Sequence, residues 1–458
     1  MTSSMNKNDK KLLIIAYAFP PHSVVGSMRP LRMAKYLEKY SGWRPVVLTV
    51  SKEFKRNDYS LLEEIPPEVK IYRSWTVEPA IRLASIRSTL FPITPKLDNG
   101  TGLFDSKSRN LLPGFLKKSL SKTLSILSEA LSVPDEQVFW NLPVIMQGMK
   151  IITKEKIDAI LITSPPWSLQ VAGFLLKKMT GVPWVVDFRD PWTDIKRKNR
   201  PAFIDTFEQR VEKRLLAEAD LVISTSDMYS NDLIQKYPGI EAQKFQTLHN
   251  GYDEEKFDHP KPVSGHSKFT IAHLGTMYSL FNPYAFFEAL RKWLAMNPEI
   301  EDKMELLFVG EVNEETRKAM HECNISHLTT VTGFVPHKEA IELCSRADML
   351  LLAMGTDDKL PRGWLPSKLF EYLALDRPIL AYVSEGEASD MVRKVNQGCV
   401  VTGQDHNQII DFMNELYVSK WRHENLYVPW ENDSKCKQRI QQPYLMKKLG
   451  TLLDGIAS

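Results

Sequence analysis

The chain has 458 residues, which is too many for one ordinary hydrophobic core and predicts two or three domains. Apolar residues make up 43% and charged residues 25%, a balance that excludes a fibrous or intrinsically disordered chain. No apolar run reaches the roughly 18 residues that a membrane-spanning helix needs. We therefore expect that this protein is not an integral membrane protein.

The net charge is +3, but the charges are unevenly distributed. Residues 1–260 carry 37 Lys and Arg against 30 Asp and Glu, whereas residues 261–458 carry 22 against 26. We therefore expect the first half to face an anionic surface. The four cysteines lie far apart and without metal-ligand spacing, which predicts reduced thiols and a cytoplasmic protein.

Short apolar runs alternate with amphipathic stretches in the first half, a pattern typical of parallel strands covered on both faces. The expected strands are Leu12–Phe19, Pro45–Val50, Val69–Arg73, Ile157–Thr163, Trp184–Phe188, Leu221–Thr225 and Phe245–His249. The expected helices are Met28–Tyr40, Leu142–Thr153, Ser168–Met179, Ile204–Ala219 and Met228–Tyr237.

Residues 74–140 contain no clear strand and are predicted to be an insertion. Five leucines in it fall at helical spacing, with lysines off their stripe: Leu116, Leu120, Leu124, Leu127 and Leu131. Two interpretations remain open, a helix packed on the domain or a helix lying on an anionic membrane surface.

The alternation stops at HNGYDEEKF (residues 249–257) and restarts near residue 268. The later expected strands are Phe269–Leu274, Met304–Val309, Thr329–Gly333, Met349–Met354, Pro378–Val383 and Cys399–Thr402. We therefore predict an N-terminal domain of residues 1–260, a C-terminal domain of residues 267–430, and a helix within 431–458 that packs back toward the first domain. The fold class is α/β, with two doubly wound Rossmann-like domains.

Several signatures are absent from the sequence. There is no G-x-G-x-x-G after the first strand and no G-x-x-x-x-G-K-[ST], which disfavours a dinucleotide-dependent dehydrogenase and a P-loop nucleotidase. G-x-S-x-G and H-E-x-x-H are also missing. No D-x-D occurs that could hold a divalent metal, so any diphosphate would have to be neutralised by protein groups.

Such groups occur in GWLPSKLFEYLALDRPILAY (residues 363–382). Pro366 and Ser367 predict a helix start with serine as a cap, whose free amides up to Leu369 attract an anion. Lys368 adds a full positive charge, and Glu371 follows on the same helical face. The alternatives are a diphosphate site with Glu371 on the ribose hydroxyls, or a surface helix with a Lys–Glu pair.

PSKLFEYLALDRPILAY resembles the donor-site segment of family 4 glycosyltransferases, which are retaining enzymes of the GT-B fold with two Rossmann-like domains facing across a cleft. The family pattern is Glu-x7-Glu, in which Glu371 matches the second glutamate. The first glutamate falls on Gly363, and Asp357 and Asp358 are candidates to compensate.

Other segments extend the resemblance. HLGTMY (residues 273–278) implies that Gly275 and Thr276 face the donor phosphates. VTGFVPH (residues 331–337) implies that Gly333, Phe334 and Val335 line the nucleobase pocket. HNGYD resembles the connection between the two domains of the family.

In the first domain, YAFPPHSVVGSMRPLRMAKYL resembles the opening strand, loop and helix of the family. We expect Gly26 to let the backbone approach the reacting sugar, and Arg29 and Arg32 to meet an acceptor phosphate. The alternative is an ordinary turn with exposed arginines.

VVDFRDPWTD (residues 185–194) follows a predicted strand, so Arg189 and Asp190 should emerge at the carboxyl edge of the sheet. Asp190 is our candidate base for the acceptor hydroxyl. Alternatively, Arg189 and Asp190 only brace this loop.

The resemblance implies sugar transfer, with retention and without metal or cofactor, from a UDP- or GDP-linked donor. The implied acceptor is a saccharide or lipid-linked saccharide of polysaccharide biosynthesis, handled in the cytoplasm or at the inner face of the membrane; no nucleic acid is expected. Two alternatives remain, a UDP-sugar 2-epimerase-like enzyme and a non-catalytic nucleotide-sugar-binding protein.

Overall fold

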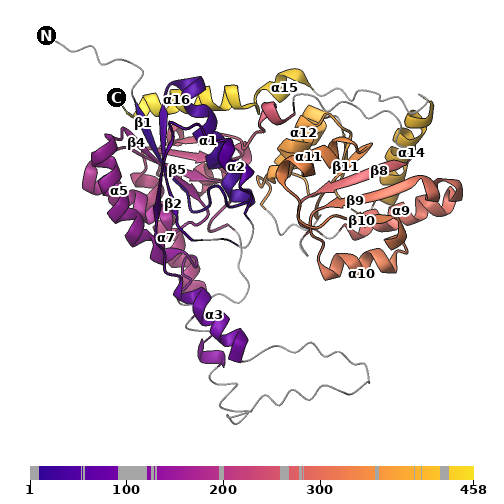
Figure 1. Cartoon of the computed structure of the whole chain (residues 1–458), viewed down its shortest axis with the longest axis horizontal. Helices are drawn as coiled ribbons and strands as arrows, with labels where there is room; N and C mark the ends of the chain where they lie inside the picture. Colours follow the sequence, from indigo (N-terminus) through magenta and orange to yellow (C-terminus); the bar gives the residue numbers. More distant parts are fainter. Residues whose placement is uncertain are drawn as a thin grey trace.

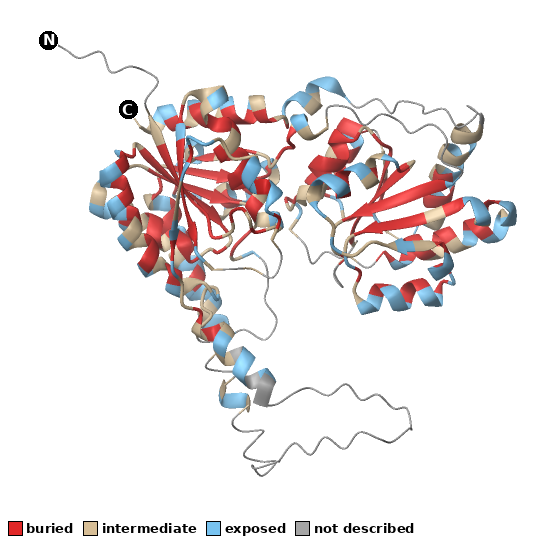
Figure 2. Ribbon diagram, in the orientation of Figure 1, coloured by how far each residue is buried: buried red, intermediate tan, exposed pale blue. Residues whose placement is uncertain are grey.

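The computed structural model describes residues 10–52, 54, 57–90, 121–124, 128, 131–194, 201–257, 268–277, 281, 283–355, 361–396, 398–403, 405–422 and 433–457. Figure 1 shows two α/β domains, each built around one sheet. Buried residues concentrate in the two sheets and on the inner faces of the helices around them (Figure 2). Each sheet therefore forms the centre of its own hydrophobic core.

The N-terminal sheet has seven parallel strands in the order β3-β2-β1-β4-β5-β6-β7. Their bounds are β1 Lys11–Ile15, β2 Arg44–Val50, β3 Lys70–Ser74, β4 Ala159–Ser164, β5 Trp184–Phe188, β6 Leu221–Ser224 and β7 Phe245–Thr247. Apolar runs such as LLII in β1 are buried on both sides, because helices cover both faces of the sheet.

One face of this sheet packs against α5 (Asn141–Glu155), α6 (Leu169–Thr180), α7 (Ala202–Glu218) and α8 (Asp227–Lys236). The other face packs against α1 (Val25–Ser41) and the C-terminal helix α16 (Gln442–Ile456). The short helix α2 (Ser60–Glu63) follows β2, and α3 (Pro79–Leu90) follows β3. This places the helices on both faces of one sheet, which is the doubly wound arrangement.

The C-terminal sheet has six parallel strands in the order β10-β9-β8-β11-β12-β13. They are β8 Phe269–Leu274, β9 Met304–Val309, β10 Thr329–Val331, β11 Met349–Gly355, β12 Ile379–Val383 and β13 Cys399–Val401. The surrounding helices are α9 Tyr284–Met296, α10 Glu314–Glu322, α11 His337–Ser345, α12 Ser367–Ala374, α13 Glu387–Met391, α14 His406–Arg422 and α15 Ser434–Gln438. The carboxyl ends of both sets of strands lead into the loops through which the two domains meet.

The last helix returns to the N-terminal domain. In Figure 1, α16 lies beside α1, far from the C-terminal sheet that precedes it in the sequence. Leu445, Leu449 and Leu453 of α16 are buried in the same cluster as Met33 and Leu37 of α1. The chain therefore crosses between the domains twice, once after β7 and once before α16.

All the expected strands occur, with ends shifted by a few residues. The first strand ends at Ile15 instead of Phe19, because the chain turns away before Pro20-Pro21. Helix α3 in the insertion was not expected. The predicted leucine stripe over 116–131 lies largely outside the described residues, and so do Asp357 and Asp358.

We predict that Gly450→Ala lowers the free energy of unfolding by about 1–3 kcal/mol, because a methyl group there overlaps Ser41 of α1. Gly455→Ala in the same helix is the matched control, since a Cβ there meets no atom within 4 Å. It should leave stability unchanged or raise it by up to about 1 kcal/mol. Urea unfolding measures both, and equal stabilities of the two variants would contradict the α1–α16 packing.

Candidate active site

Helix α12 begins at the edge of the C-terminal domain with its amides open. Pro366 is the residue before the helix and Ser367 the first residue within it, and no side chain caps this end. The prediction that Ser367 acts as a cap is therefore wrong. Helix geometry leaves the amides of Ser367 and Lys368 without intrahelical acceptors, so the positive end of α12 can receive an anion.

Lys368 extends from this helix start to the end of β8. Its Nζ lies 3.9 Å from the position that a Cβ on Gly275 would occupy, and Gly275 has a φ of +90°. The absent side chain leaves room for a ligand beside the ammonium group. The structure thus brings together two segments, residues 273–278 and 363–382, that were separately predicted to face the donor phosphates.

Sequence reasoning missed a second glycine beside the first. Gly310, after β9, has a φ of +144°, and a Cβ there would lie 2.6 Å from the carbonyl carbon of Gly275. Gly310 therefore lets the two loops pack backbone to backbone. The segment FVGE (residues 308–311) carried the signal, since a glycine directly after a buried strand marks a close approach.

His273 orients the lysine from within β8. The imidazole is fully buried; Nδ1 lies 2.9 Å from the carbonyl oxygen of Leu351, and Nε2 lies 3.1 Å from Lys368 Nζ. Burial and the nearby lysine charge hold the pKa of His273 well below its usual value. A neutral ring that donates from Nδ1 must accept at Nε2, so His273 receives one ammonium hydrogen of Lys368.

Burial also changes the lysine itself. It lowers the pKa of Lys368 to about 8, although Glu371 and Cys344 act in the opposite direction. The ammonium form is thus only moderately favoured near neutral pH in the free protein, and a bound anion would favour it further.

Glu371 lies one turn further along α12, with 8% of the residue exposed. Its Oε1 lies 2.8 Å from His337 Nε2 and 3.6 Å from Arg32 Nη2 of the N-terminal domain. Burial alone raises the pKa of Glu371, but His337 and Arg32 outweigh it, and the pKa lies below that of an ordinary glutamate. The carboxylate is therefore ionised and able to accept hydroxyl hydrogens. His337 was not among the predicted residues.

The predicted nucleobase segment is open beside this carboxylate. Gly333 has a φ of +70°, and a Cβ there would meet no atom within 4 Å. Phe334 is 47% exposed, while Val335 packs partly on the core below α12. Thr276 lies partly exposed after Gly275. Leu369 is fully buried and its amide donates to Pro366, so it contributes to packing instead of facing outward.

Arg29 has a different environment from the one predicted. It is 5% exposed and forms a buried ion pair with Asp187, with Nη2 at 2.7 Å from Oδ1. Its Nη1 donates to the carbonyl oxygens of Leu248 and His249, at 2.9 and 3.0 Å. In this structure Arg29 holds the connection between the domains instead of presenting a free cation to an acceptor phosphate.

Gly26 and Arg189 also differ from their predicted roles at the acceptor side of the cleft. The Arg189 guanidinium donates to the carbonyl oxygens of Gly26, Ser164 and Pro165. A Cβ on Gly26 would lie 2.7 Å from Arg189 Nη1. The space that the glycine leaves is thus filled by Arg189, not kept for a sugar, and Arg189 braces the loop after β5, as the alternative interpretation proposed.

Asp190, by contrast, turns toward the other domain. Its Oδ1 accepts a hydrogen bond from the indole Nε1 of Trp364 at 2.9 Å, and its backbone oxygen accepts from Trp167 at 3.3 Å. Asp190 therefore lies at the contact between the carboxyl edges of the two sheets.

The start of α8 forms the rest of this contact. Glu387 of the C-terminal domain accepts hydrogen bonds from the amides of Asp227 at 2.9 Å and Met228 at 2.7 Å. A Cβ on Gly363 would lie 2.6 Å from the amide nitrogen of Tyr229. Glycine at the position of the first family glutamate is thus required by the packing of the N-terminal domain against this loop.

His249 lies near Asp227 and Glu387, and ligand atoms of these three residues fall within 4.8 Å of one another. Both oxygens of Glu387 already accept backbone amides, and His249 Nδ1 lies 2.8 Å from the carbonyl oxygen of Thr225. The group is accounted for as a contact between domains, and we assign no metal to it.

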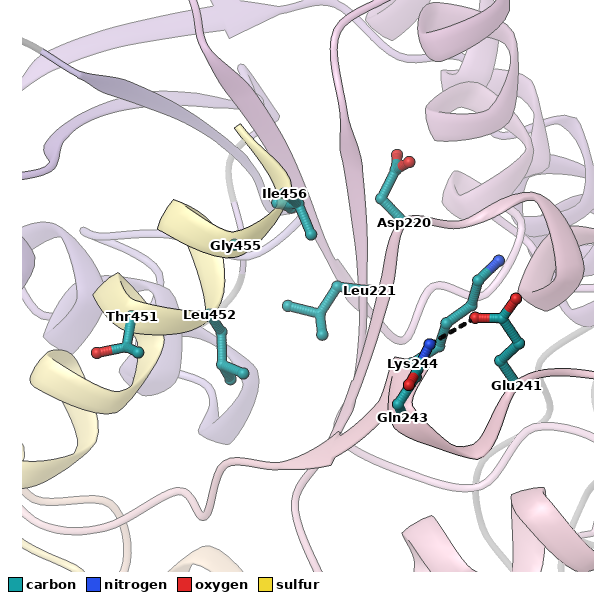
Figure 3. A pocket seen from close by; sticks show the side chains of 9 residues that line it. All are labelled: Asp220, Leu221, Glu241, Gln243, Lys244, Thr451, Leu452, Gly455 and Ile456. Atoms are coloured by element: carbon teal, nitrogen blue, oxygen red, sulfur yellow. Dashed lines mark hydrogen bonds between the residues drawn. The ribbon is translucent and has the colours of Figure 1, made fainter. Parts of the chain in front are cut away.

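A surface hollow lies away from these residues, between α16 and the amino end of β6 (Figure 3). Its lining side chains include Leu221, Leu452 and Ile456, together with a Gln243–Glu241 hydrogen bond of 2.8 Å. It is at the edge of the sheet opposite the contact between the domains and contains none of the predicted site residues.

Two facing Rossmann-like domains, with an open helix start, a lysine and a carboxylate at their contact, form the GT-B architecture of glycosyltransferases. The family model described as Glycosyltransferase Family 4 matches residues 125–256, and the model described as Glycosyl transferases group 1 matches residues 254–428. The two models together span residues 125–428, and the chain belongs to the glycosyltransferases of the family 4 type.

A curated relative and two solved structures extend the comparison. The putative colanic acid biosynthesis glycosyltransferase WcaL of Salmonella typhimurium is 21% identical over 245 residues, which cover 53% of this chain and 59% of that protein. Sucrose-phosphate synthase of Thermosynechococcus elongatus superposes with a TM-score of 0.61, 14% identity and coverage of 97% and 98%. Anabaena HepE in complex with UDP-glucose superposes with a TM-score of 0.60 and 13% identity, and the match covers 97% of this chain and 99% of that chain. These structures share the fold.

We predict that affinity for a nucleoside diphosphate falls as the pH rises through about 8, because the free protein then loses the Lys368 ammonium charge. Below that pH the charge is present and affinity should be constant until other groups titrate. Calorimetric titration with UDP between pH 7 and 9.5 measures this. A Lys368→Met variant should bind weakly with no such step, and an identical step in that variant would contradict the assignment.

Proposed function

We propose that this protein transfers a sugar from a nucleotide-sugar donor to a hydroxyl group of a saccharide acceptor. The observation that carries the proposal is the position of Lys368 over Gly275, beside the open amides of α12. A cation and free amides at one point suit a diphosphate, and the ionised Glu371 one turn away suits ribose hydroxyls.

The chemistry requires charge stabilisation at the leaving group. As the bond between the anomeric carbon and the phosphate oxygen breaks, its electron pair remains on the β-phosphate. Lys368 and the amides of Ser367 and Lys368 would stabilise that charge, which is the usual large contribution to such catalysis. The acceptor oxygen forms the new bond to the anomeric carbon, and we assign its proton to the Asp190 carboxylate.

Retention of configuration, a metal-independent reaction and a hexosyl donor belong to the same proposal. Their support is the family resemblance of PSKLFEYLALDRPILAY and the provision of protein cations where a metal would otherwise act. A UDP-linked donor is favoured over a GDP-linked one by the complex of Anabaena HepE with UDP-glucose. A role in polysaccharide assembly is supported by the partial similarity to the colanic acid relative. The cytoplasmic location is part of the same proposal, since all four cysteines are free thiols.

We predict that Lys368→Met lowers kcat/KM for transfer about 100- to 1,000-fold, since one charge-stabilising donor is lost at the leaving group. The reaction is followed by the release of UDP and by the mass of the acceptor product. Lys318→Met, on the exposed surface of α10, is the matched control and should retain full activity.

The donor is found by thermal stabilisation, because a ligand at 100 times its Kd should add about 2.7 kcal/mol to the stability of the protein. Acceptor-dependent transfer supports the proposal. Conversion of the nucleotide sugar into its 2-epimer without an acceptor, or binding without turnover, would replace it by one of the two alternative functions. Full activity in Lys368→Met would show that the donor site is not at Lys368.

We also propose that the outer face of α5 and α6 rests on an anionic membrane. Five apolar side chains on these helices are exposed: Leu142, Met146, Met149, Leu175 and Met179. Met146 is 53% and Met179 57% exposed. Moving these apolar side chains from water into the membrane would be favourable. None of the described helices is long and apolar enough to cross a membrane.

The charges on the same two helices match an anionic surface. Lys150 and Lys154 are exposed there, and Lys178 is exposed while it pairs with Glu218 of α7 at 2.8 Å. The only acid on α5 or α6, Glu155, is buried and paired with Lys70. A face of apolar side chains and lysines without exposed carboxylates is typical of binding to anionic headgroups. This surface would keep the protein near a lipid-linked acceptor.

We predict that the protein sediments with vesicles containing phosphatidylglycerol and less with pure phosphatidylcholine. Met146→Glu combined with Met179→Glu should weaken the binding about tenfold or more, since it removes apolar burial and adds negative charge. Met296→Glu, at a position 61% exposed in the C-terminal domain, is the control and should bind like the unaltered protein. Equal binding of all variants would contradict the proposed surface.

A further inference from the structure

We infer that Trp364 is a positioning residue, which orients the Asp190 carboxylate across the boundary between the two domains. This inference rests on the proposed function, because it concerns the base that we assign to the acceptor hydroxyl. Trp364 belongs to the C-terminal domain and Asp190 to the N-terminal domain, and their hydrogen bond is 2.9 Å long.

The tryptophan is itself held in place. Its backbone amide donates to the carbonyl oxygen of Pro361 at 2.9 Å, and its ring packs on Phe281 with 5.7 Å between centroids. The indole N–H is a donor only, so it fixes one oxygen of the carboxylate and cannot remove a proton from it. Oδ1 of Asp190 is thus occupied, and among the described residues no side chain donates to Oδ2. That oxygen is available to the acceptor.

The neighbouring contacts set the distance between the two domains. The first two amides of α8 donate to Glu387, which thereby carries a carboxylate from one domain to the positive helix end of the other. Gly363, directly before Trp364, packs against the amide of Tyr229 where any side chain would collide. The Glu387–α8 contact and the Gly363–Tyr229 contact consequently hold Trp364 within hydrogen-bond distance of Asp190.

These contacts couple the orientation of the Asp190 carboxylate to the contact between the two domains. When the domains separate, Asp190 loses its indole donor and Glu387 leaves α8. When they meet, the hydrogen bond restricts the carboxylate to one orientation, with Oδ2 free. A base assembled in this way acts only while the donor domain is in contact, which limits unproductive turnover of the open protein.

We predict that Trp364→Phe lowers kcat for transfer about tenfold or more, which corresponds to the loss of one hydrogen bond to a charged group. The KM for the nucleotide sugar and the affinity for UDP should stay within about twofold, since the donor groups on α12 are unaltered. The retained UDP affinity also shows that the C-terminal domain is folded. Trp75→Phe, at a position 57% exposed in the N-terminal domain, is the matched control.

A double-mutant cycle with Asp190→Asn separates this inference from the proposed function. Transfer by the unaltered protein, and its strong but measurable reduction in Asp190→Asn, test the function and the base. Trp364→Phe should cost nothing further in the Asp190→Asn background, because its effect passes through that carboxylate. Unchanged kcat in Trp364→Phe, or an equal loss in both backgrounds, would overturn the inference while the function stands. A fully active Asp190→Asn would overturn the base and the inference together.

Discussion

The relative position of the two domains depends on a row of polar side chains along α1. Arg29, buried with Asp187, and Arg32, 2.7 Å from the carbonyl oxygen of Gly251, hold the connection that follows β7. One turn later, Lys35 and Tyr36 bind Asp253. Removing one partner of a buried ion pair costs about 3–5 kcal/mol, because the other charge stays buried. The connection up to Asp253 is therefore fixed to the N-terminal sheet, and Arg32 also lies 3.6 Å from Glu371 of the C-terminal domain.

This constraint explains why Arg29 of α1 resembles a substrate-binding residue in the sequence without being one in the structure. An arginine near a glycine at a helix start suits an anion equally well in a connection rich in carbonyl oxygens. Periodicity and spacing give the side chain and its helix face, whereas the partner lies about 160 or 220 residues away in the chain. Arg29 and Arg189 could be placed at the carboxyl edge of the sheet from sequence, but their acceptors could not.

The fold was more accessible to sequence reasoning than the site. Buried runs such as WVVDF in β5 and MELLFV in β9 have one structural interpretation, because helices cover both faces. Lys368 and Glu371 were predicted from sequence, because their segment resembles the donor site of the family and helix geometry places both near the start of α12. His273, His337 and Gly310 were missed, because each acts through a contact with a distant strand or loop. A neutral buried histidine is indistinguishable in sequence from any other.

The departure at Gly363 follows from the same logic of contacts between domains. The family pattern provides a glutamate there, but the position faces the amide of Tyr229, where no side chain fits. The next residue supplies an indole to Asp190, and Glu387 supplies a carboxylate to α8. One loop of the C-terminal domain thus exchanges an acidic side chain in the site for direct packing on its partner domain. Groups for the donor sugar must then come from elsewhere at the contact, and α8 and the loop after β5 are the elements that face it.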